Sequence, residues 1–188
     1  MKVYAHGLSK VPPFFLPLYA GSLGLPSYIG AALVATFNFS SAIGRIVCGA
    51  MGDKMGPVNC LLISLLVSAI SMLALWPIST SLAPLIVFTI INGMSNGAFF
   101  AIIPTVVGSV FGSARLSVAM SMIVTGWAGG YLMGAPIAGY VLEASGGEKG
   151  GFEAYRPAIF YAGSMSVGAT AMAALVRFRM SKDPRKIL

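Results

Sequence analysis

Three charged residues stand close together in the stretch GRIVCGAMGDKMG, residues 44 to 56, of an otherwise strongly apolar chain. Arg45 carries a planar guanidinium that can hold a carboxylate by two parallel charge-assisted hydrogen bonds. Asp53 and Lys54 follow about two helical turns later, and a carboxylate there can interact with the positive N-terminal end of a neighbouring helix. These residue types predict an anion-binding group at Arg45 and an electrostatic contact at Asp53.

A structural role for Arg45 competes with the binding role. Its long side chain can extend along the helix to the membrane surface and support the turn around Asp53. Both interpretations stay open on the sequence.

Further polar and aromatic residues are candidates for the walls of a solute site. Asn38 precedes Arg45 by seven residues, so the two lie on roughly one helix face. Buried asparagines also form hydrogen bonds between helices, and aromatic residues can line a cavity or fill it. The other candidates form two pairs, each one turn apart, and the expected substrate-binding set is Arg45, Asn38, Asn92, Asn96, Trp127 and Tyr131.

Composition places these residues in a membrane protein. Only 9% of the 188 residues are charged, whereas a soluble domain carries about 25%. Uncharged runs of 34, 60, 27 and 20 residues separate the charges, and a spanning helix needs about 20 residues. The run of 60 can hold two helices, with the proline-flanked WPISTSLAP as the turn between them. We therefore expect five complete spans, near 28–49, 58–76, 82–110, 117–142 and 157–176.

The basic residues predict an orientation in the membrane, because Lys and Arg gather in cytoplasmic loops. If the turn near Lys54 is cytoplasmic, eight basic residues lie inside and four outside. This orientation places the C-terminus in the cytoplasm, and we favour the plasma membrane over an organelle membrane. The net charge of +7 does not indicate a nucleic-acid partner, because the basic residues form no continuous patch.

Glycines are expected where helices approach one another closely. Gly93 and Gly97 form one such pair, and four glycines at positions 126, 130, 134 and 139 would leave one face of a later helix nearly bare. Tight helix packing is the favoured role. Glycine-rich, broken helices also suit a protein that alternates between two shapes.

The first 25 residues do not form a complete span. Prolines at 12, 13, 17 and 26 leave only about a dozen apolar residues between them, too few to cross a bilayer as a straight helix. We interpret this segment as the outer end of a helix whose beginning is missing, with a re-entrant or interfacial segment as the alternative. The expected organisation is a helix remnant with its outer loop (1–25), a transmembrane bundle (26–180) and a cytoplasmic tail (181–188).

Gly49, Asp53, Lys54 and Gly56 follow the pattern G-x-x-x-D-[RK]-x-G between two expected spans. This pattern resembles the loop signature of the major facilitator superfamily, whose members consist of two six-helix halves. GYLMGAPIAGYVLEASGG resembles helix 11 of that fold, and FLPLYAGSLGLP resembles the end of helix 7. Within the superfamily the chain is similar to fungal monocarboxylate-transporter-like proteins, over about residues 13 to 180. The resemblance implies an all-α, polytopic transmembrane helix bundle: the second half of the fold, with five full spans (helices 8 to 12) and a partial helix 7.

The resemblance also implies a secondary carrier in which the four motif residues form a conformational latch. The implied cargo is a small organic solute, with a monocarboxylate as the expected class; the implied partners are membrane lipid and a missing N-terminal half. Animal members often have an acidic residue one turn before the arginine, where this chain has Ser41, so proton-coupled symport would need another group. The usual basic pair after the last glycine is replaced by Pro57, Val58 and Asn59, which predicts a weaker latch.

No enzymatic site, cofactor or metal is expected. The single histidine, His6, has no carboxylate or cysteine near it in the sequence, and Cys48 and Cys60 are interpreted as small packing residues. SGGEKGG lacks the strand and the Lys-Ser/Thr pair of a phosphate-binding loop. The alternative to a carrier is a truncated, non-transporting fragment that associates with other helices, because one half supplies only one wall of a substrate site.

Overall fold

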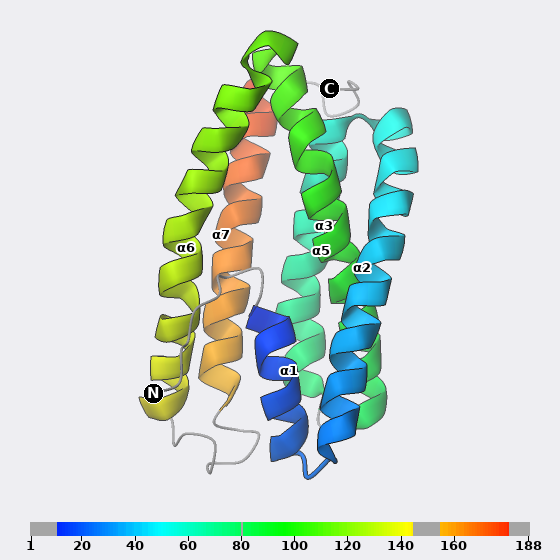
Figure 1. The fold of residues 1–188 in the computed structure, drawn as a ribbon, viewed down its shortest axis with the longest axis vertical. Helices are drawn as coiled ribbons and strands as arrows, with labels where there is room; N and C mark the ends of the chain where they lie inside the picture. The colour runs from blue at the N-terminus through cyan, green and yellow to red at the C-terminus, as the bar shows by residue number, and fades with distance from the viewer. Residues whose placement is uncertain (1–10, 80, 145–154, 181–188) are drawn as a thin grey trace.

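The computed structural model describes residues 11–79, 81–144 and 155–180, and every regular element within them is helical. The helices run along the longest dimension of the bundle (Figure 1). The expected all-α fold is confirmed. In chain order the elements are α1 (Val11–Ser22), α2 (Ser27–Met55), α3 (Pro57–Ile70), the π-helical turn η2 (Ser71–Leu75), α4 (Trp76–Ile78), α5 (Leu82–Phe111), the 3-10 turn η3 (Ser113–Arg115), α6 (Leu116–Ala144) and α7 (Arg156–Met180).

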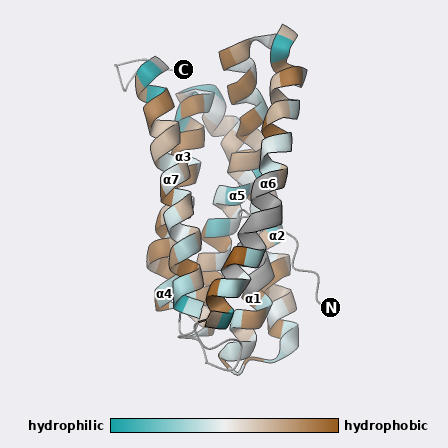
Figure 2. Ribbon diagram, turned by 90° about the vertical axis from the view of Figure 1, so that its left-hand side faces the viewer, coloured by the Kyte–Doolittle hydropathy of each residue, from teal (hydrophilic) through white to brown (hydrophobic). Residues whose placement is uncertain are grey.

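Among the described residues, four helical segments are long and apolar enough to cross a membrane: α2, the continuous helix Pro57–Ile78, α5 and Arg156–Arg179. The fifth expected span corresponds to α6, which is 29 residues long. Apolar residues cover most of the length of the helices (Figure 2). The protein is therefore an integral, multi-pass membrane protein.

The turns gather at two ends of the bundle. The α2–α3 turn, the α5–α6 turn and the end of α7 lie at one end, and the α1–α2 turn lies at the other (Figure 1). Lys54, Arg115, Arg177 and Arg179 therefore share one end, whereas Arg156 begins α7 at the opposite end. This grouping agrees with the charge asymmetry expected from the sequence.

The sequence predicted that the span 28–49 would end at Gly49. The α2 helix instead continues to Met55. The motif is therefore helical, and the turn is reduced to Gly56. Gly56 has a φ of 84°, a left-handed conformation that glycine adopts without steric cost, and Pro57 follows at the start of α3, where its missing N–H costs nothing.

Small residues bring α2 and α5 into close contact. A Cβ atom at Gly93 would lie 2.7 Å from the carbonyl oxygen of Phe37, and one at Gly97 would overlap the backbone of Ser41. The packing role expected for this glycine pair is confirmed. At Gly126 and Gly139 a Cβ atom would meet no other atom of the described residues within 4 Å, so packing at these two glycines stays a prediction. Gly130 and Gly134 have no described surroundings.

An aromatic cluster holds α1 onto the bundle. The Tyr19 ring makes edge contacts with Trp76 and Tyr155, at centroid distances of 6.3 and 5.6 Å, and its hydroxyl donates to the carbonyl oxygen of Ser79 at 2.9 Å. Trp76 in turn packs on Phe88 of α5. This cluster lies at the end opposite the motif.

The long helices form two layers. Figure 2 shows α3 and α7 on one side of the molecule and α2 and α6 on the other. The α5 helix contacts members of both layers. Each layer is therefore a separate surface on which a site could lie.

Candidate functional site

The α2 helix presents a polar stripe that the described helices leave uncovered. Asn38, Arg45, Gly49 and Asp53 follow one another at spacings of seven, four and four residues, which places them along one side of the helix. All four are exposed. The buried residues Phe37, Gly44 and Cys48 each directly precede a member of the stripe, so the packed side of α2 lies about 100° around the helix from it. The charged and polar groups of α2 thus lie away from its packing against α5.

Arg45 lies deep within the span. It precedes Asp53 by eight residues, about 12 Å along the helix, whereas half of a hydrocarbon core is about 15 Å. In an α-helix the Cα–Cβ bonds tilt toward the N-terminus, so the Arg45 side chain starts away from the end that carries Asp53. Both facts favour a guanidinium that faces a cavity over one that extends to the motif end.

Aromatic residues lie at a similar depth on α5, which packs against α2, and on α6, which packs against α5. Trp127 is eleven residues from the start of α6, and Arg45 is ten residues from the end of α2, at the same end of the bundle. The Trp127 ring contacts Phe99 and Phe100 of α5, at centroid distances of 6.0 and 5.7 Å. Trp127 is partly exposed. These three rings offer an apolar wall at the depth of Arg45.

The predicted asparagines separate into different settings. Asn92 is 2% exposed, and its Nδ2 donates to the hydroxyls of Ser71 at 2.8 Å and Ser68 at 3.4 Å. This arrangement matches the alternative role of a hydrogen bond between helices, here between α5 and the π-helical turn. Asn38 donates to the carbonyl oxygen of Val34 at 2.9 Å and remains exposed.

The remaining positions to consider are Asn96, Tyr131 and Ser41. Asn96 is partly buried. The side chain of Tyr131 lies outside the described part of the chain. Ser41, at the position where the family resemblance implies an acid, is 8% exposed and packs on Gly97. A carboxylate at position 41 would therefore lie in the α2–α5 contact rather than on the polar stripe.

The motif residues lie at the end of the polar stripe. Asp53 and Lys54 are exposed in the last turn of α2, and a Cβ atom at Gly49 would meet no other atom of the described part of the chain within 4 Å. The described helices leave this side of α2 uncovered. The latch therefore stays a prediction.

Sequence reasoning missed a basic residue that reaches this turn from α7. Arg177 is 5% exposed, and its Nε donates to Oδ1 of Asn59 at 2.6 Å. Asn59 in turn donates through Nδ2 to the carbonyl oxygen of Met55 at 2.7 Å. A positive charge thus reaches the turn whose local sequence lacks the usual basic pair. No local signal could have revealed it, because 118 residues separate Arg177 from Asn59.

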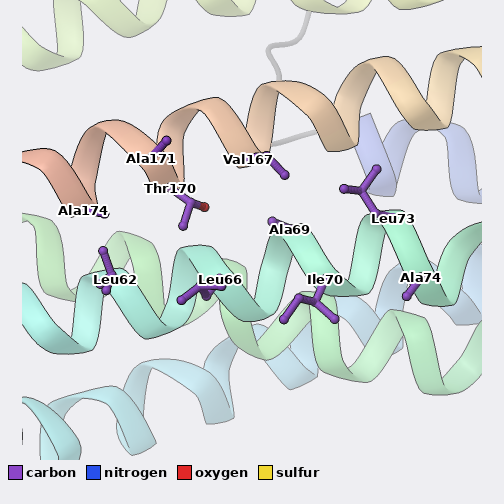
Figure 3. Close-up of a pocket in the computed structure, with 10 residues that line it drawn as sticks. All are labelled: Leu62, Leu66, Ala69, Ile70, Leu73, Ala74, Val167, Thr170, Ala171 and Ala174. Carbon is purple, nitrogen blue, oxygen red and sulfur yellow. The ribbon is translucent and has the colours of Figure 1, made fainter.

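An apolar groove between α3 and α7 lies in the other layer (Figure 3). Its volume is about 470 Å³, and its lining includes Leu66, Ile70, Leu73 and Val167. The hydroxyl of Thr170, which also lines the groove, donates to the carbonyl oxygen of Ser166 at 2.8 Å. The groove suits hydrocarbon rather than an anionic solute, so the α2–α6 layer is the better candidate for the solute site.

Comparisons with known proteins agree with this architecture. A family model of the Major Facilitator Superfamily matches residues 5–188. The chain is 28% identical over 161 residues to the MFS transporter asaE of Aspergillus flavus, covering 86% of this chain and 35% of that protein. It is 34% identical over 139 residues to the aspyridones efflux protein apdF of Emericella nidulans, covering 72% of this chain and 28% of that protein. It is 29% identical over 188 residues to monocarboxylate transporter 12 of Xenopus laevis, covering 96% of this chain and 39% of that protein. The chain thus spans less than half the length of each of these relatives.

Proposed function

Because this chain belongs to the major facilitator superfamily, we propose that it is the C-terminal half of a secondary carrier for a small organic carboxylate. The position of Arg45 is the observation that carries the proposal. An exposed guanidinium deep within an apolar span is costly in lipid, and such residues generally face a cavity or a partner. A carboxylate is the anion that a planar guanidinium binds with two hydrogen bonds.

The aromatic rings indicate the second property of the cargo. Phe99, Phe100 and Trp127 supply apolar surface at the depth of Arg45. An acid with an apolar or aromatic body can therefore bind Arg45 through its carboxylate and contact these rings through its body. The names of two relatives, a monocarboxylate transporter and an efflux protein for aspyridones, support an organic cargo. An apolar monocarboxylate is therefore the proposed class, and the Asn38 amide is the proposed second polar contact.

The proposal requires an opposing wall. Carriers built from two repeats bind their substrate near the middle of the membrane, between the repeats. This chain covers 35% and 39% of the length of two relatives, so we assign the opposing wall to an N-terminal half. The same half would supply the helix that contacts Gly49 and Asp53. We place the motif end and the C-terminus in the cytoplasm, and the protein in the plasma membrane, where the basic end meets anionic lipid.

Uptake of radiolabelled benzoate tests this function. We expect saturable uptake in cells that express this chain joined to the proposed N-terminal half, and no uptake with the 188-residue chain alone. Benzamide, which has the same ring but no charge, should neither enter nor compete. Equal transport of benzamide would contradict the role of the carboxylate. Transport by the chain alone would contradict the assignment to one half, and no benzoate uptake by the joined protein would contradict the proposed cargo.

A further inference from the structure

The chain has two cysteines, and their sulfur atoms lie next to each other. Cys48 lies in α2 and Cys60 in the first turn of α3, and their Sγ atoms are 3.0 Å apart. The two residues are 2% and 3% exposed. This separation is about 1 Å longer than a disulfide bond and well below the usual contact distance of about 4 Å between packed side chains. Packing alone, the role expected from the sequence, does not require such an approach.

The pair encloses the motif. Cys48 immediately precedes Gly49, and Cys60 lies one turn after Gly56, so the 12-residue separation contains all four motif residues. Ile102 of α5 packs against both cysteines, so three helices meet at this point. A covalent bond between the sulfurs would tie α2 to α3 on both sides of Gly56, whose left-handed conformation makes the turn.

We propose that Cys48 and Cys60 form a redox modification site, at which oxidation produces an intrachain disulfide bond across the motif turn. With hydrogen peroxide as the oxidant, the sulfur of one thiol gives up its proton and attacks a peroxide oxygen, which forms a sulfenic acid, and the proton completes the water that leaves. The second thiolate attacks the sulfenic sulfur, the S–S bond forms, and the second water leaves. Two electrons pass from the two sulfurs to the peroxide, and a small thiol reverses the reaction by exchange.

A metal site fits this geometry less well. Metal centres with thiolate ligands use three or four protein ligands, and the described residues contain no group of three histidine, cysteine or acidic side chains. A disulfide needs only two sulfurs in suitable positions. In a reducing compartment such bonds are transient and regulatory rather than permanent, which matches a bond placed across the predicted latch.

The chain offers a direct chemical test. Trypsin cleaves after Arg45, Lys54 and Arg115, so it separates a Cys48 peptide (46–54) from a Cys60 peptide (55–115). We expect hydrogen peroxide to remove both free thiols of the detergent-purified chain. The two peptides should then appear as one linked species, lighter by two hydrogen atoms, that dithiothreitol separates. Cys48→Ser and Cys60→Ser are the matched controls, and neither can form the linked species.

Three outcomes would overturn the proposal: thiols that survive peroxide, separate sulfinic acids without a linked peptide, or disulfides between chains only. A second test asks whether the disulfide restrains the turn at Gly56 and so slows transport. This test rests on the proposed function. Benzoate uptake by the joined protein should fall at least about fivefold on oxidation and recover with dithiothreitol, but stay unchanged in Cys48→Ser. Unchanged uptake after complete formation of the Cys48–Cys60 disulfide would show that this bond does not restrain the turn. A failure of the proposed function would instead abolish uptake in both redox states and leave the linked peptide intact.

Discussion

Gly97→Ala is expected to lower the free energy of unfolding by about 3 kcal/mol, because the new Cβ atom would overlap the backbone of Ser41. A backbone neighbour cannot rotate away as a side chain can, so α2 and α5 must separate. Their contact also includes Gly44, which faces the backbone of Met94 in the same way. Thermal unfolding of the detergent-purified chain should show a midpoint roughly 6 to 12 °C lower.

Gly126→Ala is the matched control. A Cβ atom at this position meets no other atom within 4 Å, and alanine is the better helix former by about 1 kcal/mol. We expect an unchanged or slightly raised midpoint for this variant. An equal loss of stability in both variants would show that helix flexibility, rather than close contact, is the property that these glycines supply.

Arg45→Ala in the joined carrier is expected to raise the KM for benzoate by about 10-fold to 150-fold. The substitution removes a hydrogen-bonded charge, and a hydrogen bond to a charged group contributes about 1.5 to 3 kcal/mol. Arg45→Lys keeps the charge but loses the paired donors. Its KM should therefore lie between that of the unsubstituted carrier and that of Arg45→Ala. Uptake of radiolabelled benzoate over a range of concentrations provides the measurement.

Arg115→Ala supplies the control for charge alone. Arg115 is exposed in the turn at the motif end, outside the apolar spans, and its loss should leave the KM for benzoate unchanged. If Arg45→Ala also leaves the KM unchanged, Arg45 does not bind the carboxylate. A KM that rises equally in both variants would instead indicate a general effect of positive charge on anion uptake.

Much of the fold follows from where charges are absent. Long uncharged runs bounded by Arg45, Lys54, Arg115 and Arg156 favour spanning helices, because each run is long enough to cross a bilayer as a helix that satisfies its own backbone hydrogen bonds. The same logic could not locate the end of α2, since glycine and charged residues at positions 49 to 54 suit a loop and a helix end equally. The left-handed conformation of Gly56 decides between them, and it is a property of the folded turn.

The candidate site was only partly predictable for a similar reason. Spacing placed Asn38 and Arg45 on one face, because residues seven apart differ by only about 20° around a helix. Spacing could not show that Asn92 bonds to Ser71, or that Arg177 reaches Asn59, because these contacts join distant parts of the sequence. The approach of the two cysteines also depends on how α2 and α3 pack and not on any local pattern.

The account rests on one claim, that the polar stripe of α2 faces an aqueous path that a carboxylate occupies. Alkylation of a cysteine at position 38, in the joined protein with Cys48→Ser and Cys60→Ser, tests this claim most directly. The Asn38→Cys protein should react with a hydrophilic maleimide, and benzoate should slow the reaction at least about fivefold. Val167→Cys, in the apolar groove between α3 and α7, should stay unreactive with or without benzoate. An unreactive Asn38→Cys, or one whose rate benzoate does not change, would contradict the account.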